Sequence, residues 1–261
     1  MVRRLAQLVL LLAAMLAAAP AQAGGVFGDW SAVVVAGDWH AHSGGPSEAF
    51  DNARHDVVAA LEHAGFEASH LRQFSVRPER YKDEGLGKSA PQEIYNAMAD
   101  LAAKAPGGCL VYFSSHGSPG GVVVDQQLLP PAVLADMLDH TCGPRPTVVI
   151  ISACFSGVFV PALAGPNRMV LTAARPDRSS FGCGEADKYP YFDQCVLESL
   201  PGSSDFAVLA RAVQGCVAAR ETKEGMKPPS EPQLFIGAGI KPLLPLLALN
   251  SAARSGASQT H

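Results

Sequence analysis

The segment Thr147–Ile151 reads TVVII, an uninterrupted run of β-branched residues. Two further runs share its character, since Cys109–Phe113 reads CLVYF and Ser31–Ala36 reads SAVVVA. None of the three alternates apolar with polar residues, as a strand with one face in water does. Such runs are typical of strands covered on both faces of a parallel sheet, and they predict an α/β protein.

Stretches with helical spacing separate these strands. In the first of them, Phe50, Ala53, Val57 and Leu61 recur at intervals of three and four before Gly65, which places them on one buried stripe. This alternation of strands and helices predicts a doubly wound, three-layer α/β sandwich. The helices that we expect cover about 47–63, 89–106, 130–140, 191–200 and 205–220. The other segments that we expect are strands over Ala68–Val76, Arg168–Thr172 and Gln233–Ile236, a hairpin over Gly120–Leu129 and a charged loop over Arg77–Lys88.

Composition limits the class of protein and its partners. Of the 261 residues, 48% are hydrophobic and 17% charged, which is the balance of a folded globular domain and not of a disordered chain. Lys and Arg number 20 against 24 Asp and Glu, and this net charge of −4 argues against nucleic acid as a partner. We therefore expect one domain of ordinary core content.

The N-terminus has the layout of an export signal. Arg3 and Arg4 precede an apolar Leu/Ala run, and Ala21-Gln22-Ala23 offers the small residues that signal peptidase recognises. We expect residues 1–23 to be removed, which leaves 20 − 2 = 18 basic against 24 acidic residues, a balance of −6. The mature protein is then periplasmic or secreted and not stably inserted in a membrane, with an uncleaved membrane anchor as the alternative. We expect residues 24–240 to form the folded domain and residues 241–261 to be a flexible C-terminal tail.

Cysteine usage agrees with an oxidising compartment. There are six cysteines, so if one stays free for chemistry, at most two disulfides can form. We expect a Cys183–Cys195 disulfide, because both residues adjoin turn or loop sequence and the closed loop is short. Cys109, inside an apolar strand, is expected to be a buried residue without a partner.

Chemistry-bearing residues follow two of the predicted strands. His116 comes after Cys109–Phe113 within Ser-Ser-His-Gly-Ser, and Cys154 comes after Thr147–Ile151 within Ser-Ala-Cys-Phe-Ser-Gly. Ligands of open α/β sheets bind at the carboxyl ends of strands, and consecutive strands are usually neighbours. An imidazole and a thiol in one crevice are what nucleophilic catalysis by cysteine needs, although either residue alone is more often structural.

The order of the two residues favours one class of cysteine enzyme. The elbow of α/β-hydrolases and the papain-like site both need a His downstream of the nucleophile, and the only His after Cys154 is the terminal His261. The base must therefore lie upstream. A His that precedes the Cys by a few tens of residues is the order of caspase-like peptidases.

These motifs resemble the legumain family of cysteine peptidases, peptidase family C13. The resemblance is carried by Val33–Gly37, by Tyr112–Ser118 and by Ile151–Gly157, and Trp39–His42 with Thr172–Cys183 resembles the bacterial exported branch. It implies a caspase-like, mostly parallel six-stranded sheet, His116 as general base, Cys154 as nucleophile, and an oxyanion held by the amides of Gly117 and Cys154. It also implies a polypeptide substrate and no cofactor.

Candidates for the substrate pocket come from the neighbouring loops. The better-known eukaryotic members of the family carry acidic residues where this chain has Ser152 and Phe155, so a less charged pocket is expected here. The further candidates are Ser115 beside the base, His40 and His42 after the first strand, and Asp177 and Arg178 after the fifth. Asp38, His40 and His42 share the spacing of metal ligands on an extended segment, but no further ligand is identifiable and we expect no metal.

The sequence therefore predicts an exported cysteine endopeptidase that acts through a Cys-His dyad and a thioester acyl-enzyme. A transpeptidase on the same dyad, in which an amine replaces water, is one alternative. A non-catalytic binding module on the same scaffold is the other, and it predicts an unreactive or disulfide-bonded Cys154.

Overall fold

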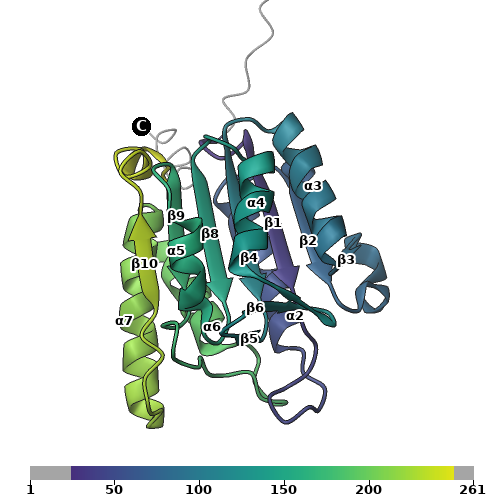
Figure 1. The fold of residues 1–261 in the computed structure, drawn as a ribbon, viewed down its shortest axis with the longest axis vertical. Helices are drawn as coiled ribbons and strands as arrows, with labels where there is room; N and C mark the ends of the chain where they lie inside the picture. The colour runs from purple at the N-terminus through teal and green to yellow at the C-terminus, as the bar shows by residue number, and fades with distance from the viewer. Residues whose placement is uncertain (1–24, 250–261) are drawn as a thin grey trace, which may run out of the picture.

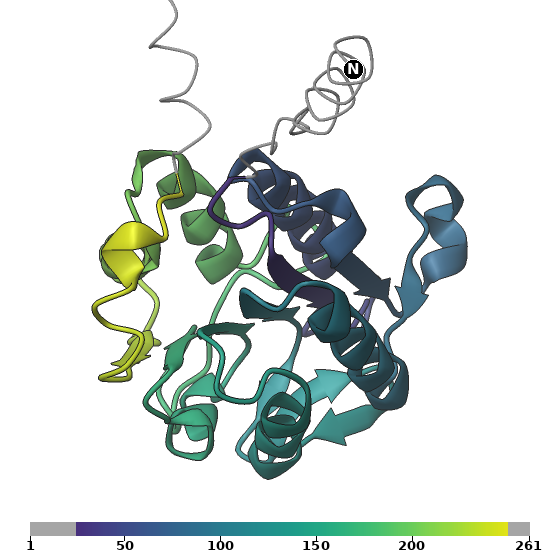
Figure 2. The ribbon, with the colours of Figure 1, turned by 90° about the horizontal axis from the view of Figure 1, so that it is seen from above.

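A computed structural model describes residues 25–249 and shows a sheet between two layers of helices (Figures 1 and 2). The expected signal segment, residues 1–23, lies outside the described residues. The strands of the main sheet are β1 (Trp30–Ala36), β2 (Leu71–Ser75), β3 (Gly87–Lys88), β4 (Gly108–Ser114), β8 (Thr147–Ser152), β9 (Arg168–Thr172) and β10 (Gln233–Ile236). The main helices are α2 (Ala49–His63), α3 (Pro91–Lys104), α4 (Pro131–Thr141), α5 (Phe159–Leu163), α6 (Tyr191–Ser199) and α7 (Phe206–Glu224).

The main sheet has the strand order β10-β9-β8-β4-β1-β2-β3 and is parallel except for β10, which runs antiparallel to β9. The sequence predicted six strands. The seventh is β3, a two-residue strand that pairs with the end of β2 inside the segment expected to be a charged loop. The predicted second strand is also shorter than expected, since Ala68–His70 form a 3-10 turn. The α/β class and the mostly parallel sheet are confirmed.

Both faces of the sheet are covered, which explains why its strands carry no polar alternation. In β4, Leu110 and Tyr112 pack on the face that α2, α6 and α7 cover, whereas Val111 and Phe113 pack on the face of α3, α4 and α5. Figure 1 shows α3, α4 and α5 in front of the sheet and α2, α6 and α7 behind it. All seven residues of β4 are buried.

Local sequence signals set the helix ends. The Asp205 carboxylate accepts hydrogen bonds from two backbone N–H groups of the first turn of α7, and Gly225 ends that helix with a φ of 69°. Pro91 and Pro131 begin α3 and α4, where a missing N–H costs no hydrogen bond.

The chain between 241 and 249, which the sequence assigned to a tail, continues the core. Leu244 and Leu249, like Ile240 just before this segment, are buried against the layer of α2, α6 and α7. The N–H of Leu249 donates to the carbonyl of Ser204. Among residues 25–249, no helix has the length and apolarity that crossing a membrane requires.

Two disulfides replace the pairing that we expected. Cys109 bonds Cys142 at the end of α4, and Cys195 bonds Cys216, with Cα separations of 6.1 and 5.7 Å. The Cys183–Cys195 prediction is wrong because Cys195 lies on the buried face of α6, against α7, whereas Cys183 lies in the loop before α6. The expectation that Cys109 is unpaired is also wrong.

Candidate active site

The loops with the predicted functional residues gather at one edge of the sheet. Strands β2, β1, β4, β8 and β9 are parallel neighbours, so their carboxyl ends all reach the lower edge in Figure 1. A small second sheet lies at this edge, made of β5 (Gly117–Ser118), β6 (Gly121–Val124) and β7 (Gln127–Leu129). It includes the hairpin that the sequence predicted over Gly120–Leu129.

The imidazole of His116 is held in a defined orientation. Its Nε2 lies 2.9 Å from the backbone carbonyl oxygen of His40. A carbonyl only accepts hydrogen bonds, so Nε2 carries the proton, and the neutral ring presents Nδ1 as its acceptor. The buried ring of Phe50 meets the imidazole edge-on, with centroids 5.0 Å apart. His116 can therefore take up a proton only at Nδ1.

Asp38 holds the segment of chain that carries the His40 carbonyl. One carboxylate oxygen of Asp38 accepts hydrogen bonds from the backbone N–H groups of Trp39 and His40, at 2.6 and 3.0 Å. The same oxygen lies 2.7 Å from Nδ1 of His40, so the imidazole of His40 faces Asp38 while its carbonyl faces His116. His42, the other predicted pocket histidine, is exposed, and its N–H donates to the carbonyl of Cys183.

Cys154 follows β8 in a tight turn, and its thiol is not part of either disulfide. The next residue, Phe155, has a φ of 58°, a left-handed conformation that is uncommon for residues other than glycine. The Sγ atom contacts Ser180, whose N–H donates to it at 3.3 Å and whose hydroxyl lies 3.6 Å away. The binding-module alternative required a bridged or unreactive Cys154, and the first of these two conditions does not hold.

The loops that carry the two residues are in contact. Ser114 and Ser152 are direct partners at the end of the β4–β8 pair, and the N–H of Ser115 donates to the carbonyl of Ser152 at 3.0 Å. A Cβ atom at Gly117 would lie 2.2 Å from the carbonyl oxygen of Cys154. Among the described residues, no hydrogen bond joins the His116 ring to Sγ of Cys154, and a catalytic hydrogen bond of this kind often tightens only when substrate is bound.

Gly117 offers an amide at this contact. The N–H of Val123 donates to the carbonyl of His116, and Gly117 stands opposite Val122 in the β5–β6 pair. Hydrogen-bonded and non-bonded pairs alternate in an antiparallel ladder, so the N–H of Gly117 points away from β6. This N–H can donate to an oxyanion that forms beside Cys154.

Two of the predicted pocket residues point elsewhere. The hydroxyl of Ser115 donates to the carbonyl of Val123, and that of Ser152 donates to the carboxylate of Asp193. Both serines are buried, with exposed fractions of 3% and 2%. They are therefore structural residues of the strand ends and do not line an open pocket.

The loop after β9 supplies the remaining pocket candidates. The N–H of Phe155 donates to the carbonyl of Arg178 at 2.7 Å, which holds the loop against the turn that contains Cys154. The guanidinium of Arg178 pairs with exposed Asp177 at 2.6 Å. Phe155, Asp177 and Arg178 are thus placed where they can contact a substrate bound at Cys154.

Cys183, in the same loop, is the second free cysteine. Burial raises the pKa of its thiol to about 11, and the neighbouring Cys154 adds to the rise. Cys183 is therefore a neutral thiol close to the candidate nucleophile. Asp193 was not identified from the sequence, although a carboxylate in the apolar stripe of α6 is a signal that could have found it.

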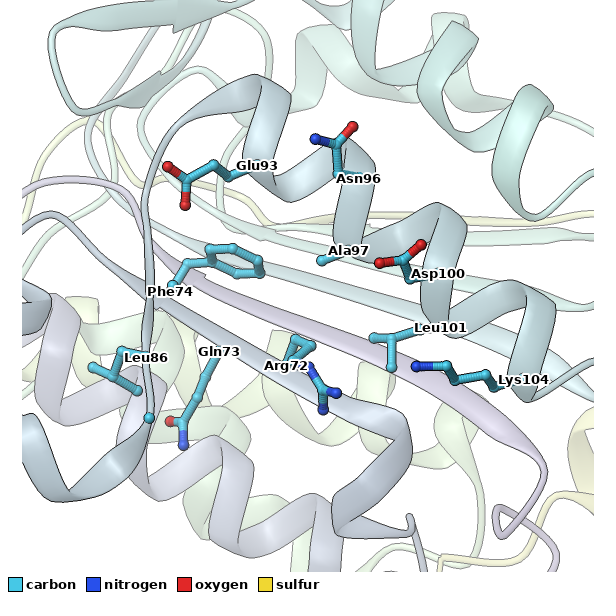
Figure 3. A pocket seen from close by; sticks show the side chains of 12 residues that line it. Arg72, Gln73, Phe74, Leu86, Glu93, Asn96, Ala97, Asp100, Leu101 and Lys104 are labelled. Carbon is cyan, nitrogen blue, oxygen red and sulfur yellow. The ribbon is translucent and has the colours of Figure 1, made fainter.

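A groove of about 370 Å³ lies away from this edge, between β2, the segment around β3 and helix α3. Figure 3 shows Arg72 and Lys104 along it together with Glu93 and Asp100. No residue of the loops after β4 and β8 lines it. Its lining residues are of mixed charge and include no Cys, Ser, Thr or His, which separates this groove from the candidate active site.

Within residues 25–249, the one group of three side chains of metal-ligand type that lie together is Cys195, Glu198 and Cys216, and its two sulfur atoms are bonded to each other. Metal binding by thiolates needs them free.

The chain is similar to known proteins in part of its sequence and in its fold. Residues 100–206, which include His116 and Cys154, match the model of the peptidase C13 family. The fold is similar to that of the crystal structure of caspase-1 from Spodoptera frugiperda, with a TM-score of 0.58 and 16% identity over 80% of this chain and 87% of that chain. No curated protein matches the sequence. The caspase-like fold expected from the sequence is confirmed.

Proposed function

We propose that this chain, a cysteine-type peptidase of the legumain-like family in the caspase clan, hydrolyses polypeptides with Cys154 as nucleophile and His116 as base. The observation that carries the assignment of residues is the contact between the two loops at the ends of paired strands β4 and β8. His116, with Nδ1 as its acceptor, and an unbridged Cys154 stand on those loops.

The acylation step follows from these positions. Nδ1 of His116 takes the thiol proton, and Sγ of Cys154 attacks the carbonyl carbon of the scissile peptide bond. The negative charge that develops on the carbonyl oxygen is stabilised by the N–H groups of Gly117 and Cys154. The imidazolium then gives its proton to the leaving amine, and a thioester remains on Cys154.

Deacylation reverses the proton movements. Water enters beside His116, loses a proton to Nδ1 and attacks the thioester, which releases the carboxylic acid and the thiol. The bond from Nε2 to the His40 carbonyl persists through both steps and stabilises the imidazolium, because the carbonyl accepts a hydrogen bond from a ring that is then positively charged.

Replacement of Cys154 by Ala tests this assignment, with Cys183→Ala as the matched control because both thiols are free and lie near each other. On a mixed peptide library read by mass spectrometry, Cys154→Ala is expected to abolish cleavage while Cys183→Ala retains it. The free energy of unfolding of Cys154→Ala should stay within about 1–2 kcal/mol of that of the wild type. Cleavage by Cys154→Ala at the wild-type rate would refute the proposal.

We also propose that the protein works in an oxidising compartment after export. The two disulfides support this location, since such bonds are rare in cytosolic proteins. N-terminal sequencing of the protein recovered from the cells that produce it should begin at Gly24. A chain that begins at Met1 would contradict the proposal of a cleaved signal peptide.

A further inference from the structure

Asp193 is a buried carboxylate that none of the catalytic steps uses. It lies in the first turn of α6 with an exposed fraction of 0%. Its Oδ2 atom accepts hydrogen bonds from the hydroxyl of Ser114 at 2.8 Å and from that of Ser152 at 2.7 Å. Its Oδ1 atom accepts a third from Tyr112. All three donors belong to the two strands that lead to the active site.

The register of β4 and β8 relates the contacts of Asp193 to the positions of His116 and Cys154. Ser114 and Ser152 face each other as the last pair of β4 and β8, and one carboxylate oxygen holds both hydroxyls. His116 follows Ser114 by two residues, and Cys154 follows Ser152 by two residues. A change in the spacing of this last pair therefore moves the base and the nucleophile relative to each other.

We propose that ionised Asp193 is a positioning residue, which joins the ends of β4 and β8 and so sets the distance between His116 and Cys154. This inference rests on the proposed function, because it concerns that same pair. A carboxylate suits the task because it only accepts hydrogen bonds and so satisfies all three hydroxyls at once. When it is protonated, one oxygen becomes a donor and competes with a serine for its place.

The ionised form of Asp193 lowers the free energy of unfolding. Burial raises the pKa of Asp193 to about 6, although the hydrogen bonds from Tyr112, Ser152 and Ser114 lower it. Because this value lies above the ordinary 3.8, the stabilisation linked to protonation is complete below pH 3.8 and is lost as the pH rises through about 6. A group that weakens the folded protein at neutral pH is poorly explained by stability alone.

Charged groups on α6 and on the helices packed against it do not explain the raised pKa of Asp193. Tyr112 is the titratable group in direct contact with Asp193, and burial together with the Asp193 charge raises its pKa well above the usual value. On α2, which packs against α6, Asp51 and Arg54 bond to each other. On α7, Glu221 accepts from the N–H of Ser230. On α6 itself, Glu198 contacts Gln194 and Arg220 at the surface.

The test is Asp193→Asn in the full chain, with Asp205→Asn as the matched control. Asp205 is also buried but caps α7, and Asn serves nearly as well there. At pH 7 we expect kcat of Asp193→Asn to fall at least about tenfold while KM changes little, since a small misplacement of catalytic groups costs this much. Alkylation of Cys154 by iodoacetamide should slow in parallel, and the control should match the wild type in both.

Unfolding gives a readout that does not depend on catalysis. From Asp193 alone, the unfolding equilibrium constant of the wild type should rise roughly 50-fold between pH 4 and pH 7. This rise should be absent in Asp193→Asn. If that variant does not fold, Ser152→Ala and Ser114→Ala carry the kinetic test, because each removes one hydroxyl and keeps the carboxylate.

Folded Asp193→Asn with wild-type kcat and wild-type alkylation of Cys154 would overturn the inference. Failure of the proposed function looks different. In that case Cys154→Ala cleaves as well as the wild type, whereas slow alkylation of Cys154 in Asp193→Asn still supports the positioning of the thiol.

Discussion

Gly117→Ala is the substitution whose effect can be worked out most directly from the structure. The added methyl group would lie 2.2 Å from the carbonyl oxygen of Cys154 and 3.0 Å from the Cβ of Ala153. The first distance is roughly 1 Å inside ordinary van der Waals contact, and the atom that it meets is backbone and cannot rotate away. The loop of His116 must therefore move away from the loop of Cys154 by a substantial part of that distance.

The expected loss of activity follows from this displacement. A misplacement of about 1 Å costs roughly 100-fold in rate, so kcat/KM should fall by about two orders of magnitude, or about 3 kcal/mol of transition-state stabilisation. Overpacking should lower the free energy of unfolding by about 1–3 kcal/mol, which leaves most molecules folded at 25 °C.

The assay compares kcat/KM on a cleaved peptide with the rate of Cys154 alkylation and with thermal unfolding. Gly120→Ala, in the turn between β5 and β6, is the control, because the one atom that its Cβ would crowd is the end of the Leu128 side chain, at 2.9 Å. Gly120→Ala should retain at least about a third of the wild-type kcat/KM. A Gly117→Ala variant that is folded and equally active would refute the contact between the loops as the basis of the site.

Three further predictions concern the parts of the fold around the site. Replacement of Cys195 and Cys216 by Ala should lower the free energy of unfolding by about 3 kcal/mol, because the bond closes a loop with a sequence separation of 21, and equal urea midpoints with and without the bond would contradict this. Between pH 6 and pH 9, iodoacetamide should modify Cys154 well before Cys183, since the pKa of Cys183 is raised to about 11 and its thiolate forms only toward that pH. Mass spectrometry that finds Cys183 modified first would contradict this prediction. Asp205→Ala should cost about 1 kcal/mol of stability through the lost cap of α7 and leave kcat unchanged, so an unchanged melting temperature would show that the cap contributes nothing.

Much of the fold could be predicted because burial on two faces leaves a plain signal in the sequence. Strands β9 and β10 begin and end at the predicted residues, since their apolar runs stop at loop sequence on both sides. Helix α7 extends to Glu224, beyond the predicted end at Arg220, because the residue that stops it is Gly225. Short β3 has no such signal, since two residues at an edge strand need no apolar run.

The disulfides show what spacing alone cannot give. The favoured pairing of Cys183 with Cys195 rested on a short loop, but pairing requires Cβ atoms that face each other. Cys195 faces α7 from the buried side of α6, and a loop residue that precedes α6 does not reach that side. The orientation of a helix about its own axis decided the pairing, and it is set by the whole apolar stripe.

In the candidate site, the strand register fixes the positions of His116 and Cys154, and the neighbouring loops supply the contacts of their side chains. His116 and Cys154 each stand two residues after one of two serines that are direct partners in the sheet, so the strand motifs alone bring the two loops together. The proton-accepting atom of His116 is set by the loop after β1, through the His40 carbonyl, and the surroundings of Sγ are set by Ser180 in the loop after β9. The loops contribute these contacts through backbone groups, which nearly every residue type carries, so a single sequence leaves no trace of them. Asp193 lies on helix α6 and yet accepts hydrogen bonds from the ends of β4 and β8. Its replacement should therefore change the rate of catalysis while the fold is kept, which distinguishes the positioning of the two residues from the formation of the fold.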